Sequence, residues 1–212
     1  RILELGCGRA LLTRRIATTG RDRSVLALEV DEVQHRINLG ITDLPNVRFA
    51  LGGAQAIEAA DASIDVVFMF KSLHHVPAEL MGTALREIAR VLRPGGHAYI
   101  SEPVFRGEFN EILRLFHDES RVRQLAFDAV CTAVRSGVLE LEQQVFFNSP
   151  VEFRDFDEFD RLVLGVTHTE HRLTAEVRAA VRQRFESHLT PDGVRFAQPI
   201  RVDLLRKPAP VS

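Results

Sequence analysis

Short apolar runs alternate with stretches of helical spacing through the first half of the chain. Five apolar runs predict strands, at 2–5, 24–30, 47–51, 64–70 and 97–101. Between them, apolar residues recur every three or four positions and predict helices, at 10–17, 31–39 and 80–92. Repeated strand–helix units of this length predict an α/β fold with right-handed crossovers: a doubly wound, mostly parallel sheet with helices on both faces.

The pattern changes after the fifth predicted strand. Helical spacing returns at 105–116, 120–135 and 174–189, with Thr174 as the expected N-cap of the last helix, and a strand is predicted at 139–147. One or two strands broken at Pro199 are expected within 195–206. We therefore expect three regions: a sheet-forming half at 1–103, a mostly helical cover inserted after strand five at 104–190, and closing strands at 191–212.

Most of the phenylalanine lies in the second region. Its members are Phe105, Phe109, Phe116, Phe127, Phe146, Phe147, Phe153, Phe156 and Phe159. The first three recur at helical spacing, which requires a buried stripe. The last three stand among acidic residues, so we expect that segment not to be wholly buried.

A glycine-rich turn follows the first predicted strand. The strand ends in the carboxylate of Glu4, passes Gly6 and Gly8, and runs into a helical pattern. Glycines allow a sharp turn and a close ligand approach, and the following helix directs its unpaired N–H groups at that ligand. This is how a parallel strand builds a nucleotide-sized site. The alternative is a tight strand-to-helix turn without a ligand. A nicotinamide-binding turn would have a third glycine where this chain has Leu11.

The second predicted strand also ends in a carboxylate. Glu29 stands at its end, where a carboxylate can accept hydrogen bonds from both ribose hydroxyls. Asp31 is the rival, but it is the expected N-cap of the next helix. A surface acidic residue with no ligand is the alternative interpretation of Glu29.

Three motifs in this order resemble a known family. The pattern E-x-G-x-G-x-A at 4–10 resembles the first motif of class I S-adenosylmethionine-dependent methyltransferases, with Ala10 where that family usually has a third glycine. Residues 63–76 resemble the family's fourth strand and following loop, and residues 90–97 resemble the turn before its fifth strand. The resemblance covers roughly residues 1–103.

The resemblance implies a Rossmann-like fold, S-adenosylmethionine as cofactor, and a set of cofactor-binding positions. The implied residues are Glu4, Gly6, Cys7 and Gly8 at the methionine end, Glu29 with Val30 at the ribose, Gly53, Ala54 and Gln55 at the adenine, and Lys71 beyond strand four. The family often has an acidic residue at position 53. Because this chain has glycine there, we expect that side-chain contact with adenine to be lost.

Two histidines follow the fourth predicted strand, where ligands bind in open α/β sheets. His74 or His75 could take a proton from a methyl acceptor, and Glu102 after strand five is a further candidate on the acceptor side. The alternatives are that a ring packs on the cofactor or braces the loop, and that Glu102 is a solvated strand end. A base is needed only if the nucleophile must lose a proton.

The composition narrows the class of protein. The chain has 212 residues, 45% hydrophobic and 26% charged, and a net charge of −2, as in a soluble globular domain without the basic footprint of nucleic-acid binding. Cys7 and Cys131 indicate neither a disulfide framework nor a zinc site, and His168, Glu170 and His171 are interpreted as a polar loop, so no metal is expected. With no apolar run near ~20 residues, we expect a cytoplasmic protein without a membrane span. Because the chain starts at Arg1, almost on the first motif, we expect it to be a fragment.

These observations favour a methyltransferase that acts on a small organic acceptor. Some phenylalanines of 104–190 would then line an apolar acceptor pocket, with a homodimer contact as the competing use. Two other classes stay open: a non-catalytic cofactor-binding or scaffolding domain of the same fold, and a nicotinamide-dependent oxidoreductase.

Overall fold

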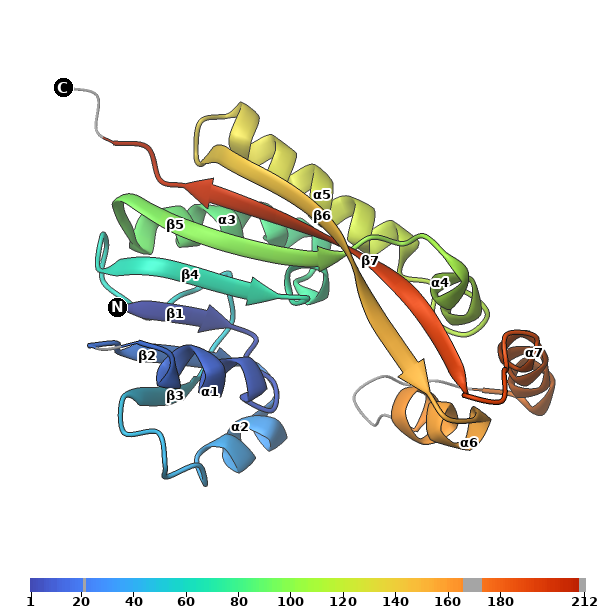
Figure 1. Cartoon of the computed structure of the whole chain (residues 1–212). Helices are drawn as coiled ribbons and strands as arrows, with labels where there is room; N and C mark the ends of the chain where they lie inside the picture. The colour runs from blue at the N-terminus through green and yellow to red at the C-terminus, as the bar shows by residue number, and fades with distance from the viewer. Residues whose placement is uncertain (21, 166–172, 210–212) are drawn as a thin grey trace. The chain divides into compact units, whose positions relative to one another are not determined.

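The computed structural model describes residues 1–20, 22–165 and 173–209 (Figure 1). Their strands form a seven-stranded sheet of order β3-β2-β1-β4-β5-β7-β6. The strands are β1 (Ile2–Leu5), β2 (Val25–Glu29), β3 (Val47–Leu51), β4 (Ile64–Phe70), β5 (Leu92–Pro103), β6 (Glu140–Phe153) and β7 (Val194–Arg206). The five strands β1 to β5 pair in parallel. The predicted α/β fold with a mostly parallel sheet is confirmed.

Helices connect the strands as the apolar spacing predicts. They are α1 (Leu11–Thr18), α2 (Glu32–Asn38), α3 (Met81–Val91), α4 (Glu108–Leu113), α5 (Ser120–Arg135), α6 (Phe156–Phe159) and α7 (Ala175–Glu186), with the 3₁₀ turns η1 (Leu73–His75) and η2 (Ala78–Leu80) and the π-helical turn η3 (Asp160–Leu164). The Asp31 side chain caps α2 and the Thr174 side chain caps α7, as expected. None of the described helices combines the length and apolarity that a bilayer span needs.

The strand order reverses between β1 and β4. From β1 the chain builds outwards through β2 to β3, then crosses back to add β4 and β5 on the other side. In open α/β sheets, ligands bind at such a reversal, outside the carboxyl ends of the strands. At the far side, Gly95 N–H donates to the Lys207 carbonyl at 3.0 Å and Lys207 N–H donates to Gly96 at 2.9 Å, so β7 runs against β5 (Figure 1).

The described residues divide into two compact units. The sheet unit comprises residues 1–102, 124–145 and the chain from Arg201; the phenylalanine unit comprises 103–123 and 146–200. This grouping differs from the boundaries expected at 103 and 190. The physical reason is that α5 buries Ala126 and Val130 in the same core as the sheet, together with Leu139. The expected role of 104–190 as a cover stays a prediction.

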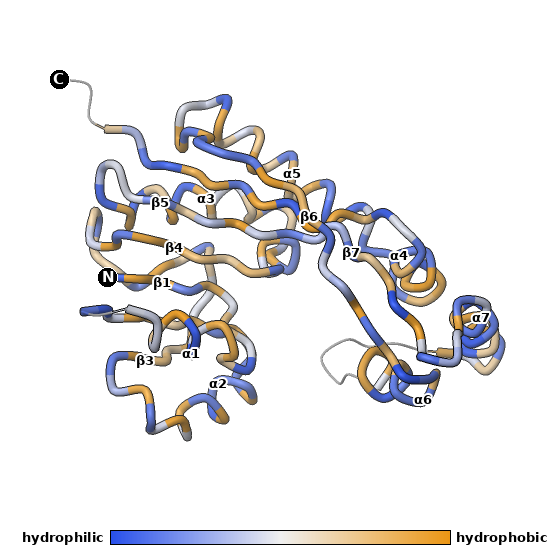
Figure 2. Tube along the Cα trace, viewed as in Figure 1, coloured by the Kyte–Doolittle hydropathy of each residue, from blue (hydrophilic) through white to orange (hydrophobic). Residues whose placement is uncertain are grey.

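The core of the sheet unit explains the apolar runs of the sequence. Leu3 and Leu5 of β1 and Met69 of β4 are at most 1% exposed and pack in one cluster with α3. Ile2, on the opposite face of β1, packs in a second cluster with Ala17 of α1. β4 therefore has an almost continuous apolar run, visible in Figure 2, because both of its faces are covered.

The phenylalanine unit has its own aromatic core. Phe153, Phe156 and Phe159 are only 6%, 4% and 0% exposed, and they pack with Phe185 in one cluster. Phe156 and Phe159 lie three residues apart on one face of α6, while Asp157 between them is exposed. The expectation that this segment is not wholly buried is therefore confirmed for its acidic residues, whereas its three rings serve as core.

The strand break expected at Pro199 was also wrong. β7 continues through this residue from Val194 to Arg206. Proline lacks only the N–H donor, and its carbonyl accepts a hydrogen bond from Val104 N–H at 2.8 Å. The extended backbone is therefore compatible with proline at this position.

Candidate cofactor and acceptor site

The turn after β1 depends on its two glycines for different reasons. Gly6 and Gly8 have φ of 75° and 51°, in the left-handed region that favours glycine. A β-carbon on Gly6 would lie 2.8 Å from Ser72 Cβ, whereas one on Gly8 would meet no atom within 4 Å. Gly6 thus permits close packing of the loop after β4, and Gly8 borders open space that a ligand could occupy.

Ala10 occupies the third-glycine position of the family motif under strain. Its φ of 58° and ψ of 23° are left-handed, and its side chain is 2% exposed. An alanine in this conformation costs about 1 kcal/mol relative to glycine. Ala10 offers α1 no side-chain cap, so the first N–H groups of this helix have no partner within the helix.

Glu29 fastens the glycine turn to the end of β2. Its Oε2 accepts the Gly8 N–H at 2.7 Å, and its Oε1 accepts those of Val30 at 2.8 Å and Asp31 at 3.0 Å. A carboxylate oxygen has two acceptor positions, so Oε2 keeps one for a ligand hydroxyl. Asp31 instead caps α2 through Val33 N–H and Gln34 N–H. Asp31 is thus confirmed as the helix cap, whereas the ribose-binding role of Glu29 stays a prediction.

Asn38 is a second residue that holds this turn in place through hydrogen bonds, and the sequence did not predict it. Its side chain is 1% exposed, and its Nδ2 donates to the Gly8 carbonyl at 2.8 Å and to Cys7 Sγ at 3.5 Å. Gln34 Nε2 donates to Asn38 Oδ1 at 2.9 Å and orients the amide. The only signal was a pair of amides four residues apart on α2, which also fits an ordinary helix face.

The Cys7 thiol lies within the turn and is unreactive near neutral pH. Burial, together with the nearby charges of Glu4 and Glu29, raises its pKa to about 12. A thiol in this state is neither a nucleophile nor a metal ligand near neutral pH. The Cys7 N–H donates to the Leu28 carbonyl at 3.0 Å, and its expected place at the methionine end of the cofactor stays a prediction.

Glu4 is a buried carboxyl group with one unpaired oxygen among the described residues. Its side chain is 2% exposed, and no described residue forms a hydrogen bond with its Oε2. Burial raises the pKa of Glu4 to about 7, and the nearby Thr13 hydroxyl opposes this only in part. An unpaired carboxylate in a protein interior is costly unless a positively charged group compensates it.

The remaining expected cofactor residues follow β2, β3 and β4. Val30 is 66% exposed beside Glu29, whereas Ala54 is 5% exposed beyond β3, between Gly53 and Gln55. Lys71 begins the loop after β4 with a left-handed φ of 54°, and its N–H donates to the Ser101 carbonyl at 2.7 Å. All ten expected cofactor residues thus lie in the sheet unit, near the carboxyl ends of β1 to β4.

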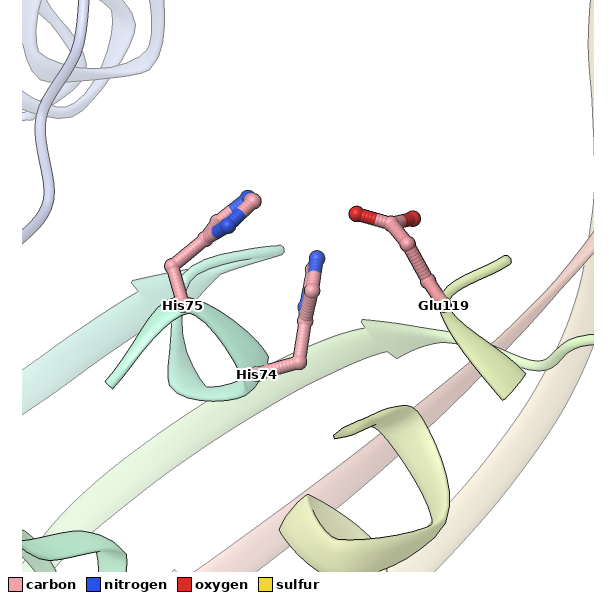
Figure 3. A group of neighbouring side chains, drawn as sticks. All are labelled: His74, His75 and Glu119. Carbon is pink, nitrogen blue, oxygen red and sulfur yellow. The ribbon is translucent and has the colours of Figure 1, made fainter. Parts of the chain in front are cut away.

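A buried histidine–carboxylate pair lies on the acceptor side of the sheet unit. His74 Nδ1 lies 2.5 Å from Glu102 Oε2, and Leu73 N–H donates to Glu102 Oε1 at 2.9 Å. Glu102 is 1% exposed, so it is not a solvated strand end. The ring of His75 lies 4.1 Å from that of His74, centroid to centroid, on the same turn η1 (Figure 3). His168, Glu170 and His171 lie outside the described residues.

The comparisons with known proteins agree with this geometry. Residues 2–96 match the model of the family described as Methyltransferase domain. The expected resemblance of the first half of the chain to class I S-adenosylmethionine-dependent methyltransferases, with their Rossmann-like fold, is therefore confirmed.

Relatives and solved structures extend the agreement. The chain is 32% identical over 117 residues to the methyltransferase GfsG of Streptomyces halstedii, covering 53% of this chain and 41% of the relative. It is 35% identical over 108 residues to 27-O-demethylrifamycin SV methyltransferase of Amycolatopsis mediterranei, covering 48% and 38%. The fold matches that of YcgJ from Bacillus subtilis with a TM-score of 0.67 at 16% identity, covering 98% and 92% of the two chains. The matched part spans about two fifths of the length of these curated relatives.

Replacing Glu4 with glutamine is expected to stabilise the ligand-free protein in a pH-dependent way. Because folding raises the pKa of Glu4 from 4.5 to about 7, stability falls as pH rises through that window. The Glu4→Gln variant escapes this penalty, so its gain in unfolding free energy should be near zero at pH 4.5 and on the order of 3 kcal/mol at pH 8. Denaturant unfolding at both pH values measures it.

A matched control is Glu58→Gln, which changes an exposed glutamate and should leave stability within about 0.5 kcal/mol. An equal gain at both pH values, or none at pH 8, would contradict the buried, unpaired state of Glu4.

Proposed function

We propose that the chain carries an S-adenosylmethionine-dependent methyltransferase activity toward a small organic acceptor. The observation that carries this proposal is the Glu4 carboxyl group, which is 2% exposed with no hydrogen bond to Oε2 from any described residue, beside a turn whose Gly8 borders open space. Glu4 and Glu29 both act on Cys7 through their charges, so two carboxylates flank the turn. Two flanking negative charges suit a ligand that carries positive charge, as S-adenosylmethionine does on its sulfonium and amino groups.

The residues present fit this cofactor in detail. Glu4 would face the positively charged methionine end, and the unpaired N–H groups at the start of α1 suit its carboxylate. Glu29, with one acceptor position left on Oε2, would take a ribose hydroxyl. Gly53, Ala54 and Gln55 would border the adenine, while Val30 and Lys71 would flank the cofactor. The Asn38 bonds to the turn would keep this cradle in place when the site is empty.

The cofactor, when bound, supplies a methyl group already activated on a sulfonium. What the protein must add is alignment of the acceptor, exclusion of water and, for a protonated nucleophile, a proton acceptor. With its Nδ1 proton held by Glu102, His74 would accept a proton at Nε2. Glu102 is then a positioning residue, fixed in turn by Leu73 N–H. His75 would brace the His74 ring.

Small organic acceptors are favoured by the relatives. One relative is named as a methyltransferase of 27-O-demethylrifamycin SV. Another is named as an O-methyltransferase of Aspergillus nomiae, and it is 36% identical over 108 residues. We also propose that part of region 104–190 lines the acceptor pocket. Its buried phenylalanines form a core and are not available for that role. The exposed Phe146 and Phe147 remain open to an acceptor or to a second copy of the chain.

Titration calorimetry tests the cofactor assignment. The protein should bind S-adenosylmethionine and S-adenosylhomocysteine but not NAD. Glu29→Ala should weaken both affinities by roughly 10- to 100-fold, the equivalent of about 1.5–3 kcal/mol for hydrogen bonds to a charged group. Glu32→Ala, whose side chain is 72% exposed on the next helix, is the matched control and should bind normally.

Circular dichroism checks that the variants fold. Unchanged affinity in folded Glu29→Ala would rule out Glu29 as the ribose ligand. Binding of NAD in preference to S-adenosylmethionine would overturn the proposed function in favour of an oxidoreductase.

Methyl transfer tests the role of His74. With labelled S-adenosylmethionine and a panel of hydroxylated aromatic and polyketide acceptors, His74→Gln should lower turnover by about 10²-fold or more and leave cofactor affinity within about twofold. Glu102→Gln should lower turnover less and change the pH profile, because it only orients the ring. Turnover within a few-fold of wild type in His74→Gln would mean that the pair is structural and that alignment alone drives the reaction.

A further inference from the structure

A groove lies between α5 and the strands β6 and β7, within the sheet unit (Figure 1). Its volume is about 200 Å³. Phe127, Cys131 and Val134 line it from one face of α5, because residues three and four apart are neighbours on a helix. Leu141 lines it from the edge strand β6. An apolar cavity of about 150 Å³ accepts benzene, so this groove has room for one aromatic ring with a short substituent.

The polar side of the groove is fixed by buried contacts. The Asp203 carboxylate is fully buried, and it accepts hydrogen bonds from Gln144 Nε2 at 2.6 Å and from Arg201 Nε at 2.8 Å. Arg201 is 6% exposed, and its Cζ lies 4.1 Å from the centroid of the Phe127 ring. The negative charge of Asp203 is therefore compensated inside the protein, and the guanidinium supports the Phe127 ring as a fixed wall.

Arg135 supplies a positive charge at the mouth of the groove. Its side chain is exposed, and its Nη2 donates to the Thr132 hydroxyl at 3.0 Å. Among the described residues, no carboxylate forms an ion pair with Arg135, and Glu140 at the start of β6 is already paired with Arg206 at 2.6 Å. The groove thus combines apolar walls with one uncompensated guanidinium.

We propose that this groove is a second binding site, which takes a small aromatic carboxylate. The ring packs between Phe127 and Leu141, and the carboxylate pairs with the Arg135 guanidinium, whose planar fork matches two carboxylate oxygens. A cationic ligand would be repelled by this charge, so the groove selects an anion. Neither the expected cofactor positions nor His74 and Glu102 line the groove, so the inference goes beyond the proposed function.

Two matched probes test the charge and the apolar wall. In ligand-detected NMR titrations, 3-phenylpropionate should bind about 3- to 5-fold more tightly than its neutral isostere 3-phenylpropionamide, the scale of an exposed ion pair. Arg135→Gln should bring the two affinities within about 1.5-fold of each other. Leu141→Asn should weaken both by about fivefold and keep the preference, because it removes an apolar wall at a half-exposed position.

Arg121→Gln is the matched control for Arg135→Gln. It removes an exposed arginine of the same helix, about 21 Å along the axis from Arg135, and should leave both affinities unchanged.

The two cysteines of the chain report where the probe lies. Cys131 lines the groove, whereas Cys7 is 7% exposed with its thiol pKa raised to about 12 and serves as the unreactive reference. Saturating 3-phenylpropionate should slow the alkylation of Cys131 by iodoacetamide, measured by mass spectrometry, and S-adenosylhomocysteine should not reverse this protection.

Three results would overturn the inference: equal affinity of the wild type for the two probes, an undiminished preference in folded Arg135→Gln, or an unchanged rate of Cys131 alkylation. Displacement of the probe by S-adenosylhomocysteine would place it in the cofactor site, which overturns the inference and leaves the proposed function intact. Circular dichroism checks the fold of each variant. If a variant does not fold, the protection of Cys131 in the wild type still decides.

Discussion

The site depends on how the end of β2 holds the backbone of the glycine turn. Three successive N–H groups of the turn, those of Gly6, Cys7 and Gly8, are bound by two residues: the Leu28 carbonyl takes the first two and the Glu29 carboxylate takes the third. The side-chain amide of Asn38 donates a further hydrogen bond to the Gly8 carbonyl. The turn is therefore fixed before any ligand arrives, and a preorganised cradle binds without the cost of ordering it.

The same arrangement explains how the site keeps two features that destabilise the folded protein locally. Ala10 is held in a left-handed conformation, and the buried Oε2 of Glu4 accepts no hydrogen bond from the part of the chain that the structure describes. Such features persist only where the surrounding structure enforces them, and they concentrate at ligand sites. Here the enforcing contacts are the bonds of β2 and α2 to the turn and the packing of Gly6 against Ser72. Ser72 Oγ also donates to the Leu5 carbonyl at 2.9 Å, which joins the loop that carries His74 to the end of β1.

Local patterns predicted most of the fold because they act over a few residues. The spacing of apolar residues placed β1 to β4 within about one residue, and Asp31 and Thr174 were predicted as caps from the hydrogen bonds they make within the next turn. The acidic neighbours correctly indicated that the Phe153 segment is not wholly buried, but they did not show that its three rings form a core. The family motifs also placed the expected cofactor positions at the strand ends, although their binding roles stay predictions.

Contacts between distant segments could not be predicted in this way. Asn38 meets Gly8 across 30 positions, and Glu102 meets His74 across 28, so neither pairing leaves a periodic signal. Residues that position others are hard to recognise from one sequence, since an amide or carboxylate at such a place also fits an ordinary surface.

The most direct measurement of the account is an NMR titration of the ¹⁵N-glycine-labelled protein with S-adenosylhomocysteine. The chain has 13 glycines spread over both units. If the cradle at the end of β1 is the cofactor site, the amide signals of Gly6, Gly8 and Gly53 shift together at one affinity, while those of Gly20 and Gly137 stay in place. Shifts confined to glycines outside the turns after β1 and β3, or none at saturating ligand, would contradict it.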